Sequence, residues 1–208
     1  MTQSTIFFLD FFWSVRNFLH IAFSMRNYFK SGTLLIAEPF ITDDSFFRAV
    51  VLIIEDNAEG TMGVVINDSS NLLMKAASEV DGAEITLKLY FGGPVESKQT
   101  MNFLHHCSDI PNALNVGEGI YWGGNAFDII DKHQTGELNE TNAIAIAGYC
   151  GWGPDQLQKE LDEKTWIVSK FKSSYIFMNA NYVWKKALSD LGGEYSWLAQ
   201  APTDVKLN

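Results

Sequence analysis

Cysteine and proline are scarce in this sequence: two cysteines, Cys107 and Cys150, and five prolines occur among 208 residues. Two cysteines cannot build the disulfide framework that holds many secreted domains together. A cleavable signal peptide is not evident either, because Asp10 and Arg16 interrupt the first apolar run. These absences predict a protein of the reducing cytoplasm.

Basic residues are also few. The chain has 15 lysines and arginines against 25 aspartates and glutamates, which gives a formal net charge of -10. A negative mean field repels phosphate backbones and anionic lipid surfaces, which argues against direct binding to nucleic acid. Hydrophobic residues make up 47% and charged residues 19%, a composition typical of a packed globule. At this length we expect a single domain.

An uninterrupted apolar run of membrane-spanning length is missing from the amino terminus, although residues 1–29 hold nine aromatic residues. Asp10, Arg16, Asn17 and His20 divide this stretch, whereas a spanning helix needs about 20 mostly apolar residues. No membrane span is therefore expected, and a helix lying on a membrane surface stays an alternative. Met25 precedes the first well-patterned strand, so residues 1–24 also fit an extension from too early a start. We divide the chain into this extension, 1–29, and one domain, 30–208.

Strands and helices alternate irregularly along the domain. Runs rich in Val and Ile predict strands. Apolar residues at helical spacing that follow an N-cap residue predict helices. Asp68 is expected to cap a helix with Leu72, Leu73, Ala76, Ala77 and Val80 on one face and Asp81-Gly82 at its end. The strands are expected at 33–39, 46–55, 61–67, 84–91, 101–105, 119–122, 143–147 and 166–169, with the second and third forming a hairpin. The remaining helices are expected after Asn125 and at 154–164 and 181–191, the last stopped by Gly192-Gly193. Without steady βαβ alternation, this order predicts an α+β fold with much antiparallel pairing.

Two glycine-rich turns follow apolar strands and are the candidate ligand site. Free backbone N–H groups at such turns can hold an anion, and a helix that begins at Pro154 would add partial positive charge. We predict one shallow pocket for a small anion or a peptide carboxylate; glycines kept only for close packing are the alternative. The candidate residues are Gly92, Gly93 and Pro94 of the first turn, Gly148, Tyr149, Gly151, Trp152 and Gly153 of the second, and His105 as a donor.

Catalytic and metal-binding groups are incomplete. His105, His106 and Cys107 are adjacent, so their side chains cannot all converge on one ion, and no Cys-x-x-Cys spacing completes a zinc site. Gly92-Gly93-Pro94 lacks the lysine of a phosphate-binding loop. A Cys150 nucleophile with a His105 or His106 base stays open as a hydrolase or transferase. We otherwise expect no catalytic residue, no metal and no cofactor.

Several motifs in this order resemble the AlgH/YqgE family of uncharacterised bacterial proteins. The similarity covers about residues 32–208, and its most specific part is the second glycine turn with the helix that follows. The matching segments are Gly32-Thr33-Leu34-Leu35-Ile36-Ala37-Glu38-Pro39, Asp44 to Val50, Gly60 to Asn67, Gly92-Gly93-Pro94-Val95, Phe103-Leu104-His105, Gly148 to Pro154 with Gln156, Leu157, Glu160 and Leu161, and Trp184 to Leu191.

The resemblance implies an α+β fold around a coiled, partly barrel-like, mostly antiparallel sheet with packed helices. It brings no catalytic residue, and the usual family label of transcriptional regulator specifies no biochemical act. Many members have Arg-Pro after the asparagine at Asn67, whereas Asp68-Ser69 stands here, so any basic contact of that arginine is absent. We therefore expect a cytoplasmic binding or regulatory module that acts through a protein partner or a small anionic ligand; its oligomeric state stays open.

Overall fold

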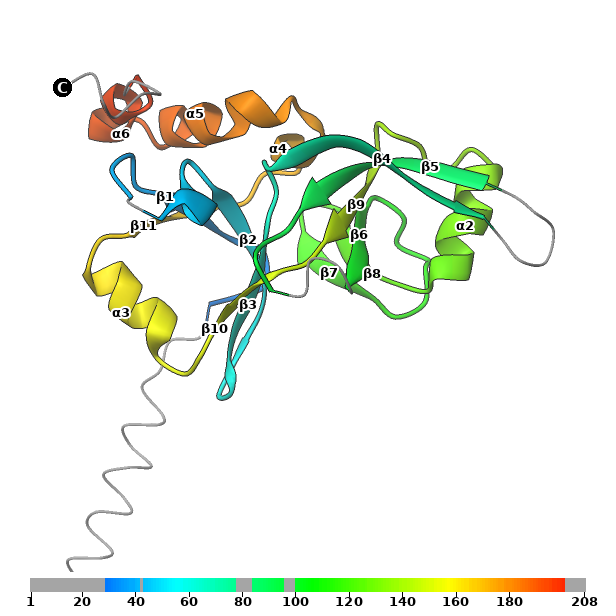
Figure 1. Cartoon of the computed structure of the whole chain (residues 1–208), viewed down its shortest axis with the longest axis horizontal. Coiled ribbons are helices and arrows are strands. Elements are labelled where there is room, and N and C mark those ends of the chain that lie inside the picture. The colour runs from blue at the N-terminus through cyan, green and yellow to red at the C-terminus, as the bar shows by residue number, and fades with distance from the viewer. Residues whose placement is uncertain (1–28, 42, 78–83, 96–99, 201–208) are drawn as a thin grey trace, which may run out of the picture.

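The computed structural model describes residues 29–41, 43–77, 84–95 and 100–200, which form two β-sheets and five α-helices (Figure 1). The α+β class expected from the sequence is confirmed. Across the described residues neither sheet closes into a barrel, because each has two free edge strands. None of the helices in this part of the chain is long and apolar enough to cross a membrane. The proposed extension, apart from Phe29, lies outside the described residues.

The first sheet has five antiparallel strands in the order β10-β3-β2-β1-β11. Both faces are covered. Helix α3 (Gln156–Asp162) packs on one face, and the C-terminal helices α4 (Ser174–Phe177), α5 (Ala180–Leu191) and α6 (Gly193–Leu198) lie on the other (Figure 1). The strands are β1 (Thr33–Ala37), β2 (Val50–Asn57), β3 (Gly60–Val65), β10 (Cys150–Trp152) and β11 (Trp166–Lys170), and a short 3-10 helix, η1 (Asp44–Phe46), joins β1 to β2.

The second sheet has six strands in the order β4-β5-β9-β6-β8-β7. Only the β5–β9 pair is parallel among the described strands. Helix α2 (Ala126–Gln134) packs on the outer face, through Ile129 against Ile85, Leu87 and Ala145. The strands are β4 (Ser69–Ala77), β5 (Glu84–Phe91), β6 (Met101–His105), β7 (Ala113–Gly117), β8 (Ile120–Gly123) and β9 (Ala143–Ala147).

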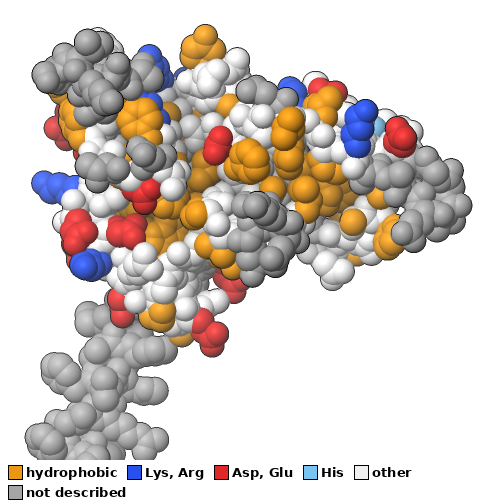
Figure 2. Space-filling view, viewed as in Figure 1, with side chains coloured by type: hydrophobic (Ala, Val, Ile, Leu, Met, Phe, Trp, Pro, Cys, Tyr) orange, Lys and Arg blue, Asp and Glu red, His pale blue; other side chains and the backbone are white. Residues whose placement is uncertain are grey.

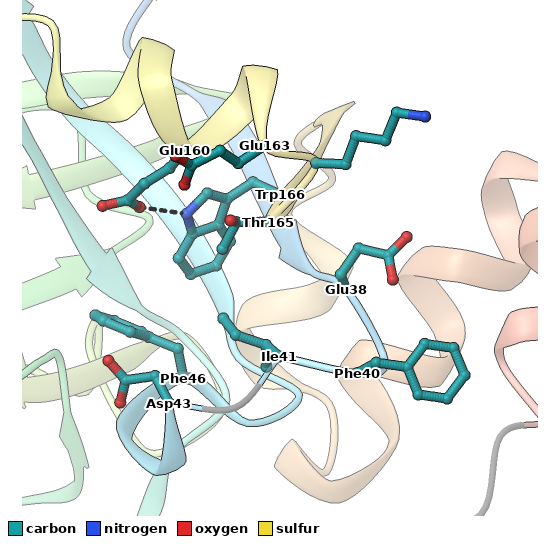
Figure 3. A pocket seen from close by; sticks show the side chains of 10 residues that line it. Glu38, Phe40, Ile41, Asp43, Phe46, Glu160, Glu163, Thr165 and Trp166 are labelled. Carbon is teal, nitrogen blue, oxygen red and sulfur yellow. Dashed lines mark hydrogen bonds between the residues drawn. The ribbon is translucent and has the colours of Figure 1, made fainter.

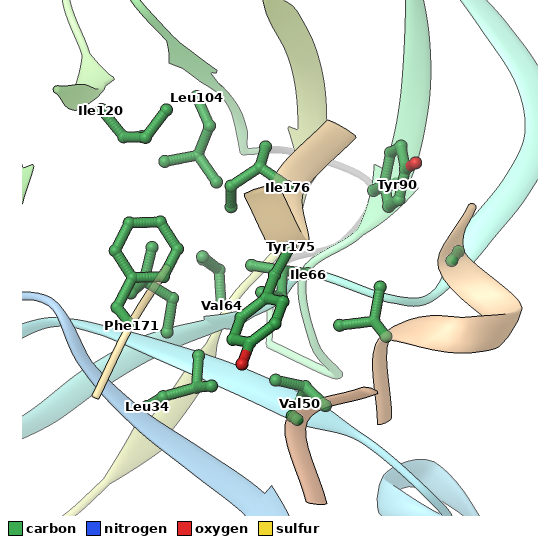
Figure 4. Packing of buried hydrophobic residues seen from close by; sticks show 14 of the residues in the cluster. Leu34, Val50, Val64, Ile66, Tyr90, Leu104, Ile120, Phe171, Tyr175 and Ile176 are labelled. Atoms are coloured by element: carbon green, nitrogen blue, oxygen red, sulfur yellow. The ribbon is translucent and has the colours of Figure 1, made fainter. Parts of the chain in front are cut away.

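The largest buried cluster joins the two sheets and the C-terminal helices. Leu34, Val50 and Val64 of the first sheet meet Tyr175 and Ile176 of α4, and the second sheet adds Leu104 and Ile120 (Figure 4). Burying such side chains contributes about 1.5–3 kcal/mol each relative to exposure. Because both sheets share this core, the described parts of the two sheets pack as one unit rather than two independent halves.

The helix expected after Asp68 is wrong: residues 69–77 form strand β4. This strand pairs with β5 from Leu72 opposite Leu89 to Ala77 opposite Glu84. Leu72 and Leu73 are 58% and 50% exposed, so the apolar residues at helical spacing form no buried helix face. Pairing with β5 supplies the cross-strand hydrogen bonds that decide the conformation. Val80 and Asp81-Gly82 lie outside the described residues.

Most other predicted elements are confirmed with small shifts. The hairpin expected within 46–67 is formed by β2 and β3, and Asn125 caps α2 by accepting a hydrogen bond from the Phe127 amide at 2.9 Å. Helix α3 begins later than expected, at Gln156, and α5 ends before Gly192. The sequence patterns missed β7, β10, α4 and α6, which are all six residues or shorter.

Candidate functional site

The two glycine-rich turns lie against each other at one edge of the second sheet. Parallel pairing of β5 with β9 brings both carboxyl ends to the same side. The Gly92 amide donates to the Ala147 carbonyl at 2.8 Å. Beyond it, Val95 and Tyr149 exchange two hydrogen bonds of 3.0 and 3.1 Å. The proximity that the predicted shared pocket requires is therefore present.

Close backbone packing explains why glycine occupies the positions where the two turns touch. A Cβ atom on Gly92 would lie well inside 3.0 Å of the Gly148 carbonyl oxygen, and one on Gly93 would overlap the Tyr149 carbonyl. Gly93 also has a φ of 146°, which side chains disfavour. The amides of Gly92, Gly148 and Tyr149 already donate to backbone carbonyls. Ligand binding by these residues and Pro94 stays a prediction.

Beyond the glycines, the second turn forms strand β10 and carries two aromatic rings. Trp152 is buried and donates its indole N–H to Glu160 at 2.9 Å. Gly151 pairs with Met62, and the Gly153 amide donates to the Gln156 side chain at 3.0 Å. Tyr149 and Trp152 line a hollow of about 490 Å³ whose charged residues are Glu55 and Glu59. The two aromatic residues of this turn therefore line an acidic surface.

His105 does not join the glycine turns. On β6, Met101 is opposite Ala147, beside the turns, whereas His105 is opposite Ala143. Four residues of extended strand separate the two ends by about 13 Å. The imidazole is fully buried, its Nε2 atom lies 3.1 Å from the Gly123 carbonyl oxygen, and burial lowers its pKa. A buried histidine held neutral in this way suits packing more than ligand capture.

The Cys150–His pair weighed from the sequence is not assembled. Cys150 is buried, its thiol lies 3.3 Å from the Gly92 carbonyl oxygen, and burial raises the pKa of the thiol to about 12. His105 and His106 lie at the far end of β6, where the His106 ring is tilted against Phe177 with centroids 5.2 Å apart. A thiol that stays protonated at neutral pH and has no adjacent base is a poor nucleophile.

The cluster around Cys107 is held by charge pairs. Lys132 reaches Asp109 at 2.6 Å and Glu137 at 2.7 Å, and hydrogen bonds to these carboxylates raise the pKa of the ammonium group. Burial raises the pKa of the Cys107 thiol. Within the described residues, no group of three or more histidine, cysteine or acidic side chains could hold a metal ion.

A further acidic hollow was not predicted from the sequence. It has a volume of about 420 Å³ and lies between β1, η1, α3 and β11 (Figure 3). Trp166 and Phe46 form an edge-to-face pair with centroids 5.4 Å apart, and Phe40 stands at the rim, 62% exposed. The lining residues are Glu38, Phe40, Ile41, Asp43, Phe46, Glu160, Glu163, Lys164, Thr165 and Trp166.

Carboxylates dominate the charge of this hollow, which we call the acidic aromatic pocket. Four of them line it with one cation, Lys164, and Glu163 also pairs with Lys159 at 3.8 Å. Acidic side chains gather beside α3 in the space-filling view (Figure 2). Glu160 is held in place, since its carboxylate accepts the indole N–H groups of Trp152 and Trp166 at 2.9 and 2.8 Å, and Asp43 accepts the Ser45 amide at 2.8 Å. Burial raises the pKa of Glu38, and Lys164 opposes that shift. The pocket therefore favours cations.

Comparison with known proteins decides the family. The family model described as AlgH-like matches residues 34–196. The chain belongs to the AlgH-like family. Among its relatives are UPF0301 proteins of Cytophaga hutchinsonii, 33% identical over 85% of this chain and 98% of the relative, and of Bacteroides thetaiotaomicron, 37% identical over 82% and 87%. The resemblance inferred from the sequence motifs is thus confirmed.

Two solved structures share the AlgH-like fold. The crystal structure of a Corynebacterium diphtheriae protein matches with a TM-score of 0.65 and 20% identity, over 85% of this chain and 94% of that chain. The solution structure of the AlgH protein from Pseudomonas aeruginosa matches with a TM-score of 0.62 and 24% identity, over 83% and 94%. At these identities the likeness supports the fold and leaves function to the local geometry.

Proposed function

We propose that this AlgH-like protein is a non-catalytic binding module that recognises a basic segment of a partner protein. The acidic aromatic pocket carries the proposal, because it combines a concave shape, exposed aromatic surface and an excess of carboxylates. An arginine or lysine side chain entering it would meet carboxylate oxygens at the rim and the exposed ring of Phe40. The overall charge of -10 adds long-range attraction to a basic partner.

A role through protein contacts also suits the regulatory label of the family. Binding to a phosphate backbone would need free basic side chains. Of the adjacent Lys185 and Lys186 on α5, Lys186 is already paired with Asp190. The remaining charge pattern favours a basic protein over a phosphate backbone. We place this activity in the cytoplasm, supported by the two cysteines, which are both free. A salt-dependent shift of duplex DNA by the purified protein would contradict the protein-partner proposal.

The direct test uses small probes and NMR. N-acetyl-arginine amide is added to labelled protein at low salt, with N-acetyl-glutamate amide as the charge control. We expect the arginine probe to shift the Trp166 indole N–H and nearby amides at millimolar concentration, which is about 4 kcal/mol of binding. Raising the salt should weaken binding, because exposed charges are screened. A silent Trp166, or equal shifts with the glutamate probe, would exclude the site.

A matched pair of variants separates local recognition from total charge. Glu38→Gln removes one carboxylate of the pocket, and Glu84→Gln removes one exposed carboxylate of β5, on the other sheet. Both change the net charge by one unit. We expect Glu38→Gln to weaken arginine binding severalfold and Glu84→Gln to leave it almost unchanged. Equal losses in both variants would mean that only the general field attracts the probe.

A further inference from the structure

Another cavity lies where the β3–β4 connection, β5 and the start of α5 meet. Its volume is about 410 Å³. Asp68 comes from the β3–β4 connection, Lys88 and Tyr90 from β5, and Asn181 from the first turn of α5. Phe177 and Met178, just before α5, add an apolar wall. This cavity shares no residue with the acidic aromatic pocket.

Tyr90 is the observation that points to a ligand. Its side chain is 4% exposed, and its hydroxyl makes no hydrogen bond to any described residue. Figure 4 shows the hydroxyl turned away from the core side chains Ile66 and Tyr175. Burial raises the pKa of the phenol. The ring is therefore buried, while the hydroxyl oxygen reaches the cavity, where a ligand can bond to it.

Asp68 and Lys88, which carry opposite charges and line this cavity, also have no partner among the described residues. Neither Asp68 nor Lys88 forms an ion pair or side-chain hydrogen bond with the described residues. Burial raises the pKa of Asp68, which is the response of a carboxylate without a compensating cation. The N-terminus of the twelve-residue helix α5 adds partial positive charge at the cavity, although the Asn181 amide already donates to the capping Asn179 side chain at 3.1 Å. The lining of the cavity thus carries one carboxylate and one ammonium group.

We propose that this cavity binds a small zwitterion of the amino-acid class, with its ammonium group at Asp68 and its carboxylate at Lys88 and the start of α5. The Tyr90 hydroxyl is a hydrogen-bond donor to that carboxylate, and Phe177 and Met178 contact an apolar side chain of the ligand. A simple anion would gain the contacts at Lys88 but meet repulsion from Asp68. A simple cation would gain only Asp68, so a ligand with both charges fits best.

The test uses the full chain, labelled with ¹⁵N, and L-leucine as the probe. We expect L-leucine to shift the amides of Asp68, Tyr90 and Ala180 to Tyr182. Acetate, phosphate and methylammonium, tested separately, should bind at least about tenfold more weakly, because each loses one charged contact. No shift with about 10 mM L-leucine, equivalent to less than about 3 kcal/mol of binding, would overturn the proposal. Equal binding of acetate or phosphate would overturn it as well, since the cavity would then be an anion site.

Tyr90→Phe tests the hydroxyl alone, with Tyr175→Phe as its matched control. Tyr175 is equally buried, but its hydroxyl already donates to Asp190 at 2.8 Å, outside the cavity. We expect Tyr90→Phe to reduce L-leucine affinity about threefold to tenfold, the effect of one neutral hydrogen bond, and to leave the thermal midpoint almost unchanged. Tyr175→Phe should lower the midpoint and leave the affinity unchanged. Unchanged affinity in Tyr90→Phe would exclude the hydroxyl and overturn the proposal.

Discussion

At the scale of single residues, tryptophans act as anchors between elements that are far apart in sequence. Trp184 is 2% exposed, and its indole N–H donates to the Ala37 carbonyl of β1 at 2.8 Å. The Arg48 guanidinium lies 4.7 Å from its ring centroid. One side chain of α5 thus joins the C-terminal helices to the first sheet and to the β1–β2 connection.

Replacing Trp184 should therefore be costly. We expect Trp184→Ala to lower the free energy of unfolding by about 3–5 kcal/mol, because it leaves a cavity and an unpaired carbonyl. Trp197→Ala is the control, since that ring is 72% exposed and its loss should cost less than about 1 kcal/mol. Urea denaturation followed by circular dichroism measures both. A small effect at Trp184 would mean that the helices dock without it.

The Cys150 thiol gives a second prediction at this scale. Its pKa is raised to about 12 by burial, compared with about 8.5 for a free thiol. A raised pKa favours the protonated thiol in the folded state, so this stabilisation is full below about pH 8.5 and is lost as the pH rises above it. We expect a thiol reagent at pH 8 to modify Cys150 only after unfolding, with Cys150→Ser identifying the signal. Rapid modification of Cys150 in the folded protein would revive the hydrolase alternative.

At the scale of elements, the junction of β5 and β9 shows how close backbone approach fixes residue choice. The Gly92 position faces the Gly148 carbonyl oxygen and the Ile146 side chain, both too near for a Cβ atom. Parallel pairing holds these two strand ends together, so neither can move away without losing the hydrogen bond from the Gly92 amide to Ala147.

We expect Gly92→Ala to destabilise the protein by about 1–3 kcal/mol, the usual cost of overpacking. Gly151→Ala is the matched control. Gly151 lies in the neighbouring turn, with an ordinary φ, and a Cβ atom there would meet only the Tyr149 ring at 3.4 Å. Its cost should stay below about 1 kcal/mol. Thermal unfolding of the two variants side by side distinguishes packing at the strand junction from general intolerance of the glycine turns.

At the scale of the whole molecule, the described fold begins at the first sheet. The Phe29 amide donates to the Asp56 carboxylate at 2.6 Å, and its side chain packs beside the cluster under α3. A chain that starts at Met25 keeps this contact. We expect its urea midpoint to match that of the full chain, with a difference below about 1 kcal/mol. A larger loss would show that residues 1–24 contribute to the stability of the domain.

The sequence by itself determined the family, the α+β class and most strands. Apolar runs such as Ala143–Ala147 and turn signals such as Gly192 are local, and the structure confirms them. The glycine turns were also visible, because glycine is needed where backbones approach closely. The order of these motifs carried the resemblance that the family match confirms.

Only the tertiary structure decided the rest. Leu72, Leu73 and the alanines after them suit either a helix or a strand by spacing, and pairing with β5 chose the strand. Strand direction placed His105 away from the glycine turns, which no local pattern shows. The acidic aromatic pocket and the cavity at Tyr90 each join segments that are far apart in the chain, for example Glu38 with Glu160, or Tyr90 with Asn181. Such sites depend on long-range packing, so periodicity and local motifs could not predict them.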